Sequence, residues 1–149
     1  ASGSVGMAGG QAIDLASVGK PLNLTELENM HMHKTGALIR ASVEMGALCS
    51  QGLDPDCFES VSKYANCIGL AFQVQDDILD IESDTKTLGK PQGSDIARNK
   101  PTYPNLLGLD GAKETVKKLH AEAIEYLQIF DSKADTLRSV ADYIVQRDK

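Results

Sequence analysis

The sequence predicts an all-α protein of 149 residues in one domain. Apolar residues recur every three or four positions through most of the chain, which is the period of an amphipathic helix. Capping residues, glycines and prolines stand between these periodic stretches, where helices begin and end. No stretch keeps a strand-like alternation of apolar and polar residues over four positions or more. With 42% hydrophobic residues, the chain is long enough to bury a substantial core without a second domain.

The first third of the chain predicts two helices. Residues 7–15 are expected to form the last turns of a helix whose start lies outside this chain, because no persuasive capping residue precedes them. Gly19–Pro21 ends this helix. Asn23 followed by Glu26, and Thr25 followed by Glu28, are both capping-box arrangements, and they open a helix that we expect to continue to about Leu48.

The remainder of the chain predicts three further helices and one long loop. A turn at residues 52–55 precedes them, and the loop at residues 85–95 is polar and bears glycines. The helices are expected over residues 55–81 and 112–130, and the last one is capped by Ser132 with Asp135 and ends in residues 146–149.

Three aspartates lie inside the apolar run at residues 68–81. At about 100° per residue, Asp76, Asp77 and Asp80 share one helix face with Gln73. Carboxylates this close repel one another, and near a helix C-terminus they also meet its negative dipole end. A cation is therefore expected, and oxygen ligands without nearby histidine or cysteine favour magnesium or calcium over zinc. The sharper prediction is a site that joins metal ions to a diphosphate, and the alternative is a solvated helix face with a chance cluster of acids.

Lysines are the candidate anion ligands. Lys34 and Thr35 interrupt the apolar pattern of the second helix, where a cation and a hydroxyl can face an anion across a cavity. Taken alone, this pair favours the alternative of a solvent-facing turn. Lys90 and Lys100 bracket a glycine-bearing loop that follows the acids, which suits a polyanion shared between metal ions and ammonium groups. The alternative for the Gly-Lys-Pro segment is an ordinary turn.

Composition excludes several classes of protein. The formal net charge is −6, so no basic stripe is available to bind a nucleic acid. No apolar run approaches the roughly eighteen residues that span a bilayer, and no charged and apolar leader opens the chain, so a soluble, cytoplasmic protein is expected. His31 and His33 lie on different helix faces, which is poor geometry for a metal pair, so we predict no chemistry for them. Cys49, Cys57 and Cys67 lack metal-ligand spacing and are expected to be reduced core thiols.

Five segments carry a resemblance to a known family: residues 10–15, 33–38, 69–80, 89–95 and 100–104. In this order they resemble the C-terminal half of the trans-prenyltransferases, or polyprenyl synthases, and most closely the bacterial farnesyl diphosphate synthases, or geranyltranstransferases. The resemblance covers all 149 residues. A single acidic triplet would not be specific for this family, whereas the five segments in this order are. The fold that it implies is the isoprenoid synthase helical bundle, of which these would be the C-terminal helices.

The resemblance implies an enzyme of isoprenoid biosynthesis. Members of the family condense an allylic diphosphate, dimethylallyl or geranyl, with isopentenyl diphosphate inside a bundle of long helices, and they release pyrophosphate. They use magnesium ions, for which manganese can substitute, and they normally work as homodimers. Overall resemblance favours farnesyl diphosphate as the product, while the residues that set chain length in this family lie just before its first aspartate-rich motif.

The resemblance also implies roles for single residues. Asp76 matches a direct magnesium ligand, and Asp77 and Asp80 match aspartates that support it through coordinated water. Thr35 and Gln73 match residues beside the developing allylic cation, where a carbonyl dipole stabilises positive charge. The other matches are substrate contacts: Lys34, Lys90 and Lys100 for the allylic diphosphate, Gln11 and Asp14 near the first metal site, and Arg147 or Lys149 in the basic tail that closes over the second substrate.

Part of the family's pattern is missing from these 149 residues. The first aspartate-rich motif, its upstream Gly-Lys-Arg segment and the arginines for isopentenyl diphosphate are absent, so we expect residues 1–149 to be the C-terminal half of a synthase domain and to be inactive alone. The apolar faces of the helices at 24–48 and 56–81 would then be uncovered, which predicts self-association. A non-catalytic helical subunit of a heteromeric synthase is the alternative, and the retained acids and lysines argue against it. A terpene cyclase is a more distant alternative, because those relatives usually carry Asn, Ser and Glu in the second metal motif.

Overall fold

The computed structural model describes the backbone of residues 1–88 and 101–147, and the side chains of all of these except 83–88. Within these ranges every regular element is a helix, which confirms the predicted all-α fold. The elements in chain order are α1 (Met7–Ala16), α2 (Leu24–His31), the π-helical turn η1 (Met32–Gly36), α3 (Ala37–Leu48), α4 (Pro55–Leu88), α5 (Tyr103–Tyr126), the 3-10 turn η3 (Ser132–Ala134) and α6 (Asp135–Gln146).

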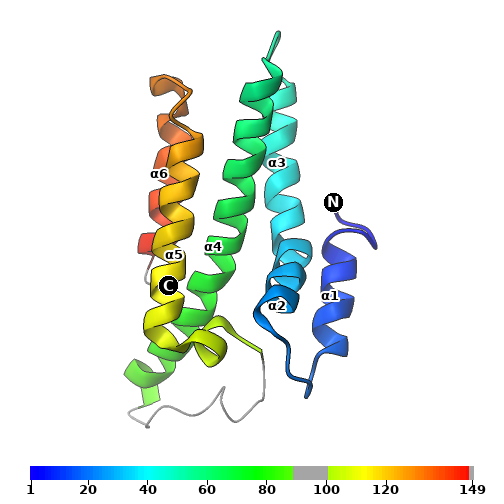
Figure 1. Cartoon of the computed structure of the whole chain (residues 1–149), viewed down its shortest axis with the longest axis vertical. Coiled ribbons are helices and arrows are strands. Elements are labelled where there is room, and N and C mark those ends of the chain that lie inside the picture. The colour runs from blue at the N-terminus through cyan, green and yellow to red at the C-terminus, as the bar shows by residue number, and fades with distance from the viewer. Residues whose placement is uncertain (89–100, 148–149) are drawn as a thin grey trace.

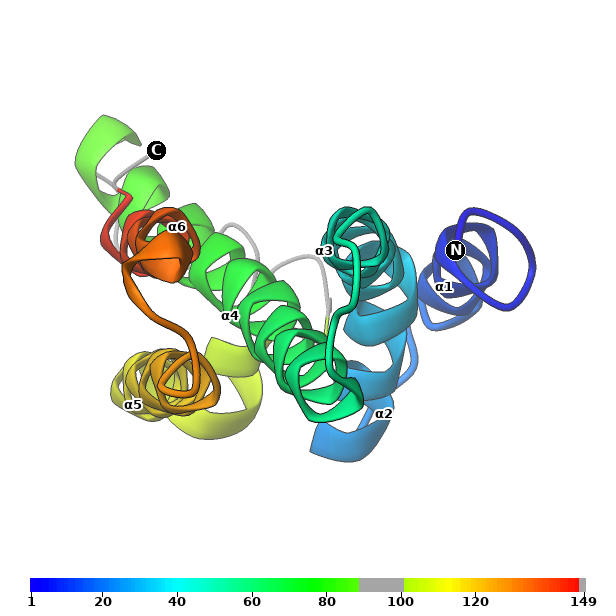
Figure 2. The same cartoon turned by 90° about the horizontal axis from the view of Figure 1, so that it is seen from above.

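Helix α4 is the centre of the molecule. The elements α1, α2, η1 and α3 lie on one side of it, and α5 and α6 lie on the other (Figure 1, Figure 2). Helices α1 and α4 both run downward in Figure 1, whereas α2, η1 and α3 follow one another upward. The face of α4 on which a residue lies therefore decides which neighbours it meets.

Two apolar clusters pack against α4. The hydroxyl of the buried Tyr64 donates a hydrogen bond of 2.6 Å to the carbonyl oxygen of Leu137, which joins the first half of α4 to the start of α6. The first cluster contains Tyr64, Ala65, Ile68, Ala71, Leu127 and Ile144. The second cluster contains Leu27, Met30, Val74, Ile78, Tyr103 and Val116.

Two helices differ from the sequence-based expectation around the predicted site. The helix expected over residues 24–48 is interrupted by η1, where five residues adopt π-helical geometry. Helix α4 continues to Leu88 instead of ending near Ile81, because residues 82–88 contain neither glycine nor proline. The three aspartates therefore lie two turns or more before the helix end. The expected repulsion by the dipole is correspondingly weak, since that effect falls off within the last turn.

Helix α5 begins well before the expected residue 112. The side chain of Thr102 accepts a hydrogen bond of 3.4 Å from the N–H of Asn105 and caps a helix that starts at Tyr103. Gly108, with a φ of 74° and a ψ of 164°, introduces a kink after the first turn. The helix ends at Tyr126, before the expected residue 130.

The other helix ends also correct the prediction. The first helix begins at Met7, within the chain, after turn residues 3–6 and without a side-chain cap. Asp131, rather than Ser132, is the capping residue before the last helix, because its carboxylate accepts a hydrogen bond from the N–H of Lys133. The 3-10 turn η3 then leads into α6 at Asp135.

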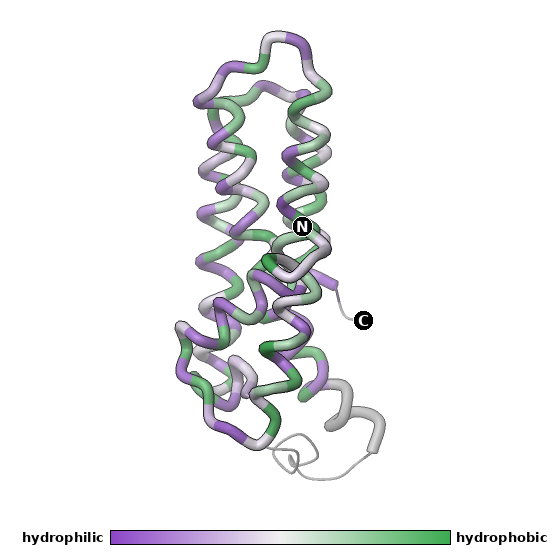
Figure 3. The backbone as a smooth tube through the Cα atoms, turned by 90° about the vertical axis from the view of Figure 1, so that its right-hand side faces the viewer, coloured by the Kyte–Doolittle hydropathy of each residue, from purple (hydrophilic) through white to green (hydrophobic). Residues whose placement is uncertain are grey.

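Apolar surface is uncovered on one helix in particular. Helix α3 has no buried residue, and Met45 and Leu48 are 61% and 69% exposed. Apolar segments recur along the helical columns between polar ones (Figure 3). The uncovered face expected for residues 24–48 is thus present on α3, whereas α4 is largely covered by the two clusters.

The cysteines agree with the predicted reduced state, since all three are free. The prediction that they are core residues holds for Cys67, which is buried, but is wrong for Cys49, which is exposed. Cys57 is half-buried. In the part of the chain that the structure describes, no helix is both long and apolar enough to cross a membrane.

Candidate functional site

The turn η1 carries Lys34 and Thr35, and it is held between two helices at glycines. A Cβ on Gly10 of α1 would overlap the backbone nitrogen of Lys34, and one on Gly69 of α4 would lie 3.1 Å from the Cα of Gly36. At Gly10 only a glycine permits this approach, whereas a Cβ on Gly69 would require its neighbour to shift by a few tenths of an ångström. Turns of π-helix frequently occur at functional sites. The close approach fixes Lys34 and Thr35 between α1 and α4.

Lys34 is paired with an acid from the first helix. Its Nζ lies 2.6 Å from Oδ2 of Asp14, and the two side chains are 35% and 30% exposed. The ammonium group is therefore accessible to another anion. Because α1 and α4 run in the same direction (Figure 1), Asp14, one turn after Gly10, and Asp76, two turns after Gly69, both lie beyond η1 toward the same end of the bundle.

Asp76 is paired with a cation from the end of the chain. The guanidinium of Arg147 donates hydrogen bonds to Oδ1 of Asp76 and to the carbonyl oxygen of Phe72, the latter at 3.1 Å, and it lies over the Phe72 ring at 4.1 Å. The Gln73 amide donates to Oδ2 of Asp76 at 3.1 Å, and Gln75 donates to the backbone oxygen of Arg147 at 3.3 Å. Asp76 is nevertheless 41% exposed. The predicted direct metal ligand is thus neutralised by the predicted substrate-binding arginine.

Asp77 points into the protein instead. Its Oδ2 accepts a hydrogen bond of 2.9 Å from the backbone N–H of Tyr103 and lies 3.7 Å from Nε2 of His31, and its side chain is 14% exposed. The His31 ring stacks on the Tyr103 ring with a centroid distance of 5.9 Å and an interplanar angle of 15°. Burial, with the Glu28 carboxylate nearby, raises the pKa of Tyr103 well above its usual range, so its phenol is neutral. Asp77 and Asp76 therefore have different surroundings, although they are adjacent in sequence.

Of the remaining predicted site residues, the structure describes some and not others. Gln11 and Thr35 are half-buried, and Asp80 is exposed. Lys90 and Lys100 lie outside the described residues, as does Lys149.

The donors present suit an incomplete magnesium site. In residues 1–82 and 101–147, whose side chains are described, no three or more His, Cys, Asp or Glu residues are arranged to hold a metal ion. Magnesium needs only one or two protein carboxylates when substrate phosphate and water supply the other ligands. Asp76 is an oxygen donor that is partly exposed and already binds a cation. These residues therefore fit a site to which the chain contributes one or two carboxylates rather than a complete cage.

His31 is the site residue that sequence reasoning missed. The prediction considered it only as half of a metal pair with His33 and assigned it no chemistry. The spacing of Leu27, Met30 and His31 places all three on the buried face of α2, and this signal could have identified it as a packing residue. Its contact with Asp77 could not have been found, because it joins segments 46 residues apart.

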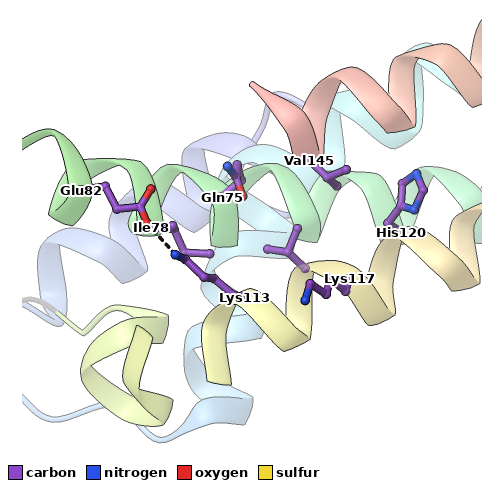
Figure 4. A pocket seen from close by; sticks show the side chains of 8 residues that line it. Gln75, Ile78, Glu82, Lys113, Lys117, His120 and Val145 are labelled. Atoms are coloured by element: carbon purple, nitrogen blue, oxygen red, sulfur yellow. Dashed lines mark ion pairs between the residues drawn. The ribbon is translucent and has the colours of Figure 1, made fainter. Parts of the chain in front are cut away.

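A pocket of about 300 Å³ lies elsewhere on α4, between this helix, α5 and α6 (Figure 4). Lys113 pairs with Glu82 at 2.7 Å across one wall. Lys117 and His120 extend the polar wall on α5. The pocket-lining residues include Gln75, which contacts Arg147, but neither Lys34 nor Asp76, so these two predicted site residues do not open into it.

Comparison with known proteins identifies the family. The sequence pattern described as polyprenyl synthetase matches residues 2–144, which is nearly the whole chain. The chain belongs to the polyprenyl synthetase family. This result confirms the resemblance to the trans-prenyltransferases.

Several polyprenyl synthetases are similar along the whole chain. The chain is 51% identical over 152 residues to farnesyl diphosphate synthase of Escherichia coli (strain K12), covering 100% of this chain and 51% of that protein. It is 46% identical over 149 residues to farnesyl diphosphate synthase of Haemophilus influenzae, covering 98% and 50%. The apo crystal structure of an FPP/GFPP synthase from Zymomonas mobilis matches with a TM-score of 0.80 and 39% identity, covering 96% of this chain and 46% of that one. The chain thus spans about half the length of these relatives.

Proposed function

We propose that this chain is part of a prenyltransferase that joins an allylic diphosphate, dimethylallyl or geranyl, to isopentenyl diphosphate. The products would be farnesyl diphosphate and pyrophosphate. The observation that carries the proposal is that the accessible ammonium group of Lys34 pairs with Asp14, which lies beyond η1 toward the same end of the bundle as the accessible carboxylate of Asp76. The bacterial relatives at 51% and 46% identity are named farnesyl diphosphate synthases, which favours that product. An Arabidopsis relative named geranylgeranyl pyrophosphate synthase is also 46% identical, so product length is the finer part of the proposal.

Lys34 is the proposed ligand of the allylic diphosphate. Its ammonium group already binds a carboxylate oxygen of Asp14 at 2.6 Å, and the pair is partly exposed. A diphosphate oxygen can replace that carboxylate oxygen without burying a new charge. Thr35 follows on the same π-helical turn. Gln73 uses its amide nitrogen on Asp76, which leaves its carbonyl oxygen to stabilise a developing allylic cation.

Asp76, with Asp80, is the proposed donor of carboxylate oxygens to magnesium, or to manganese in its place. The bound ion would supply positive charge that stabilises the departing pyrophosphate. Arg147 now holds Oδ1 of Asp76, so this oxygen would be open to a metal ion only after the guanidinium moves away. The released guanidinium can then bind the diphosphate of the second substrate, for which its planar, bidentate donors are suited. Lys90 and Lys100 are proposed to add further positive charge to the allylic site.

We propose that these 149 residues are the C-terminal half of a synthase domain. They supply the second aspartate-rich motif, and no first motif occurs among them. We therefore propose that the chain alone forms no prenyl product, while the complete protein works as a cytoplasmic homodimer. Gln11 and Asp14 are proposed to lie near the metal ligands that the other half contributes.

Calorimetric titration of the chain with pyrophosphate, in the presence and absence of manganese or magnesium, tests the proposed site. We expect metal-dependent binding that Lys34→Ala and Asp76→Asn each abolish. Lys63→Ala is the matched control, because Lys63 forms an exposed ion pair with Glu59 on another part of α4. Binding that is absent from the parent chain, or unchanged in Lys34→Ala, would contradict the proposal and favour the non-catalytic subunit.

A product assay with labelled isopentenyl diphosphate and geranyl diphosphate tests the proposed inactivity of the isolated chain. We expect no labelled prenyl diphosphate above the level of a protein-free control. Farnesyl diphosphate formed by the purified 149-residue chain would show that half of the metal ligands are dispensable, and the division into two halves would be wrong.

A further inference from the structure

The second aspartate of the acidic motif joins its own helix to a second helix by a hydrogen bond and lies close to a third. Asp77 lies on α4, and its Oδ2 accepts the backbone N–H of Tyr103 at 2.9 Å, in the first turn of α5. The same oxygen lies 3.7 Å from Nε2 of His31, the last residue of α2. The stacked rings of His31 and Tyr103 are 6% and 0% exposed, and both residues belong to buried parts of the protein.

The carboxylate of Asp77 has a binding partner within the protein, so no metal is needed to explain its burial. The first N–H groups of a helix have no partner within that helix, and the helix N-terminus carries partial positive charge. A carboxylate at that position is stabilised by both. Within the described residues, the ring nitrogens of His31 have no hydrogen-bond partner, so the ring contributes its stacking on Tyr103 and the 3.7 Å approach of Nε2 to Asp77 rather than a hydrogen bond.

Fixing Asp77 also fixes the direction of its neighbour. Successive residues of an α-helix are about 100° apart around the axis, so a helix whose residue 77 is bound to α5 cannot turn without breaking that bond. Asp76 then projects to the side where its carboxylate is 41% exposed, against 14% for Asp77.

We propose that Asp77 is a positioning residue: its bond to the start of α5, backed by the stacked ring of His31, sets the rotation of α4 that presents Asp76 to a metal-bound diphosphate. The effect on diphosphate binding rests on the proposed function, but the contact of Asp77 with Tyr103 and His31, called the joint below, is present in this chain whatever its function. This positioning role differs from the role in water-mediated metal support that resemblance gave to Asp77.

Paired substitutions separate positioning from metal support. Asp77→Asn keeps an oxygen that can accept the Tyr103 N–H but removes the negative charge, whereas Asp77→Ala removes both. Manganese-dependent binding of pyrophosphate, measured by calorimetry, should stay near the parent value in Asp77→Asn and weaken on the order of tenfold in Asp77→Ala, provided circular dichroism shows that variant folded. Asp76→Asn should lose binding, and Asp110→Asn, an exposed acid on α5, controls for the loss of one charge.

Urea unfolding supplies a second measurement that needs no metal. Asp77→Ala and His31→Ala should unfold at lower urea than the parent, while Asp77→Asn and His31→Phe, which keep the hydrogen-bond acceptor and the stacked ring respectively, should restore most of the loss. Equal loss of pyrophosphate binding in Asp77→Asn and Asp76→Asn would overturn the proposal in favour of charge-dependent metal support. If Asp77→Ala unfolded at the same urea concentration as the parent, the joint would not stabilise the fold, and the proposal would be wrong. If the parent chain bound no pyrophosphate at all, the proposed function would be contradicted. Urea unfolding of the Asp77 and His31 variants would then still show whether the joint stabilises the fold.

Discussion

At the scale of single residues, the ion pair of Arg147 with Asp76 sets the availability of the proposed metal ligand. The Arg147 side chain is 12% exposed, and its guanidinium is held by the Phe72 ring and carbonyl as well as by the carboxylate. A divalent ion that binds Oδ1 must compete with this cation, because the guanidinium already occupies that oxygen. The pair therefore competes with metal binding in the isolated chain.

Replacement of Arg147 should make Asp76 a better metal ligand. We expect Arg147→Gln to bind manganese alone roughly fivefold more tightly than the parent, as the loss of a competing ion pair predicts. Paramagnetic relaxation of water protons by added manganese measures the affinity without any anion that Arg147 could itself bind. Arg40→Gln, which breaks an exposed pair with Glu44, is the control and should change nothing. A weaker affinity in Arg147→Gln would mean that Arg147 orients Asp76 rather than blocking it.

The cysteines should differ in reactivity. Burial, with help from the Glu122 carboxylate, raises the pKa of the Cys67 thiol to about 11, whereas Cys49 is exposed. Because the thiolate is the reactive form, a disulfide reagent near pH 8 should label Cys49 quickly and Cys67 only after denaturation. The labelling rate is followed by absorbance, and Cys49→Ser should remove the fast phase. Native-state labelling of Cys67 at the rate of Cys49 would contradict its burial.

At the scale of elements, the contact of α1 with η1 determines where Lys34 lies. A side chain at Gly10 would overlap the backbone of Lys34, so Gly10→Ala must push the two elements apart. We expect it to reduce the free energy of unfolding by roughly 1–3 kcal/mol and to weaken pyrophosphate binding. Gly46→Ala is the matched control. Nothing lies within 4 Å of its added Cβ on α3, and it should stabilise the chain by about 0.5–1 kcal/mol. Urea unfolding of both variants measures the difference.

The elements also show how far local sequence signals reach. Of the two predicted capping boxes, that of Asn23 and Glu26 is present with both of its hydrogen bonds, and all of its atoms come from four consecutive residues. The π-helical turn η1 was not predicted. Its geometry depends on close approaches to Gly10 and Gly69, which are distant in sequence, and no local pattern reports them.

At the scale of the whole molecule, neutral groups buried around α4 should make the fold less stable at alkaline pH. Burial raises the pKa of Tyr64 from 10.0 to about 12 and that of Cys67 from 9.0 to about 11. In the unfolded chain these groups lose their protons at lower pH than in the folded chain. The unfolded state is therefore favoured as the pH rises.

Stability should accordingly be constant up to about pH 8 and then fall as the pH rises through the range between the unfolded and folded pKa values. Urea unfolding at a series of pH values measures the slope. Tyr64→Phe combined with Cys67→Ala should reduce the slope, and the raised pKa of Tyr103 should leave a residual part of it. Stability that does not decrease above pH 9 would contradict the raised pKa values of Tyr64 and Cys67.

The sequence by itself determined the helical fold, most of the helix order and the oxygen chemistry of the acidic motif, because periodicity, caps and residue type act over a few neighbouring positions. It also showed the family resemblance, because five motifs occur along the chain in the order in which the family has them. Only the tertiary structure decided that Asp77 is turned inward to Tyr103 while Asp76 is turned outward to Arg147, 71 residues away. The physical reason is that adjacent side chains on a helix point about 100° apart, and which of them is buried depends on the helices packed around it.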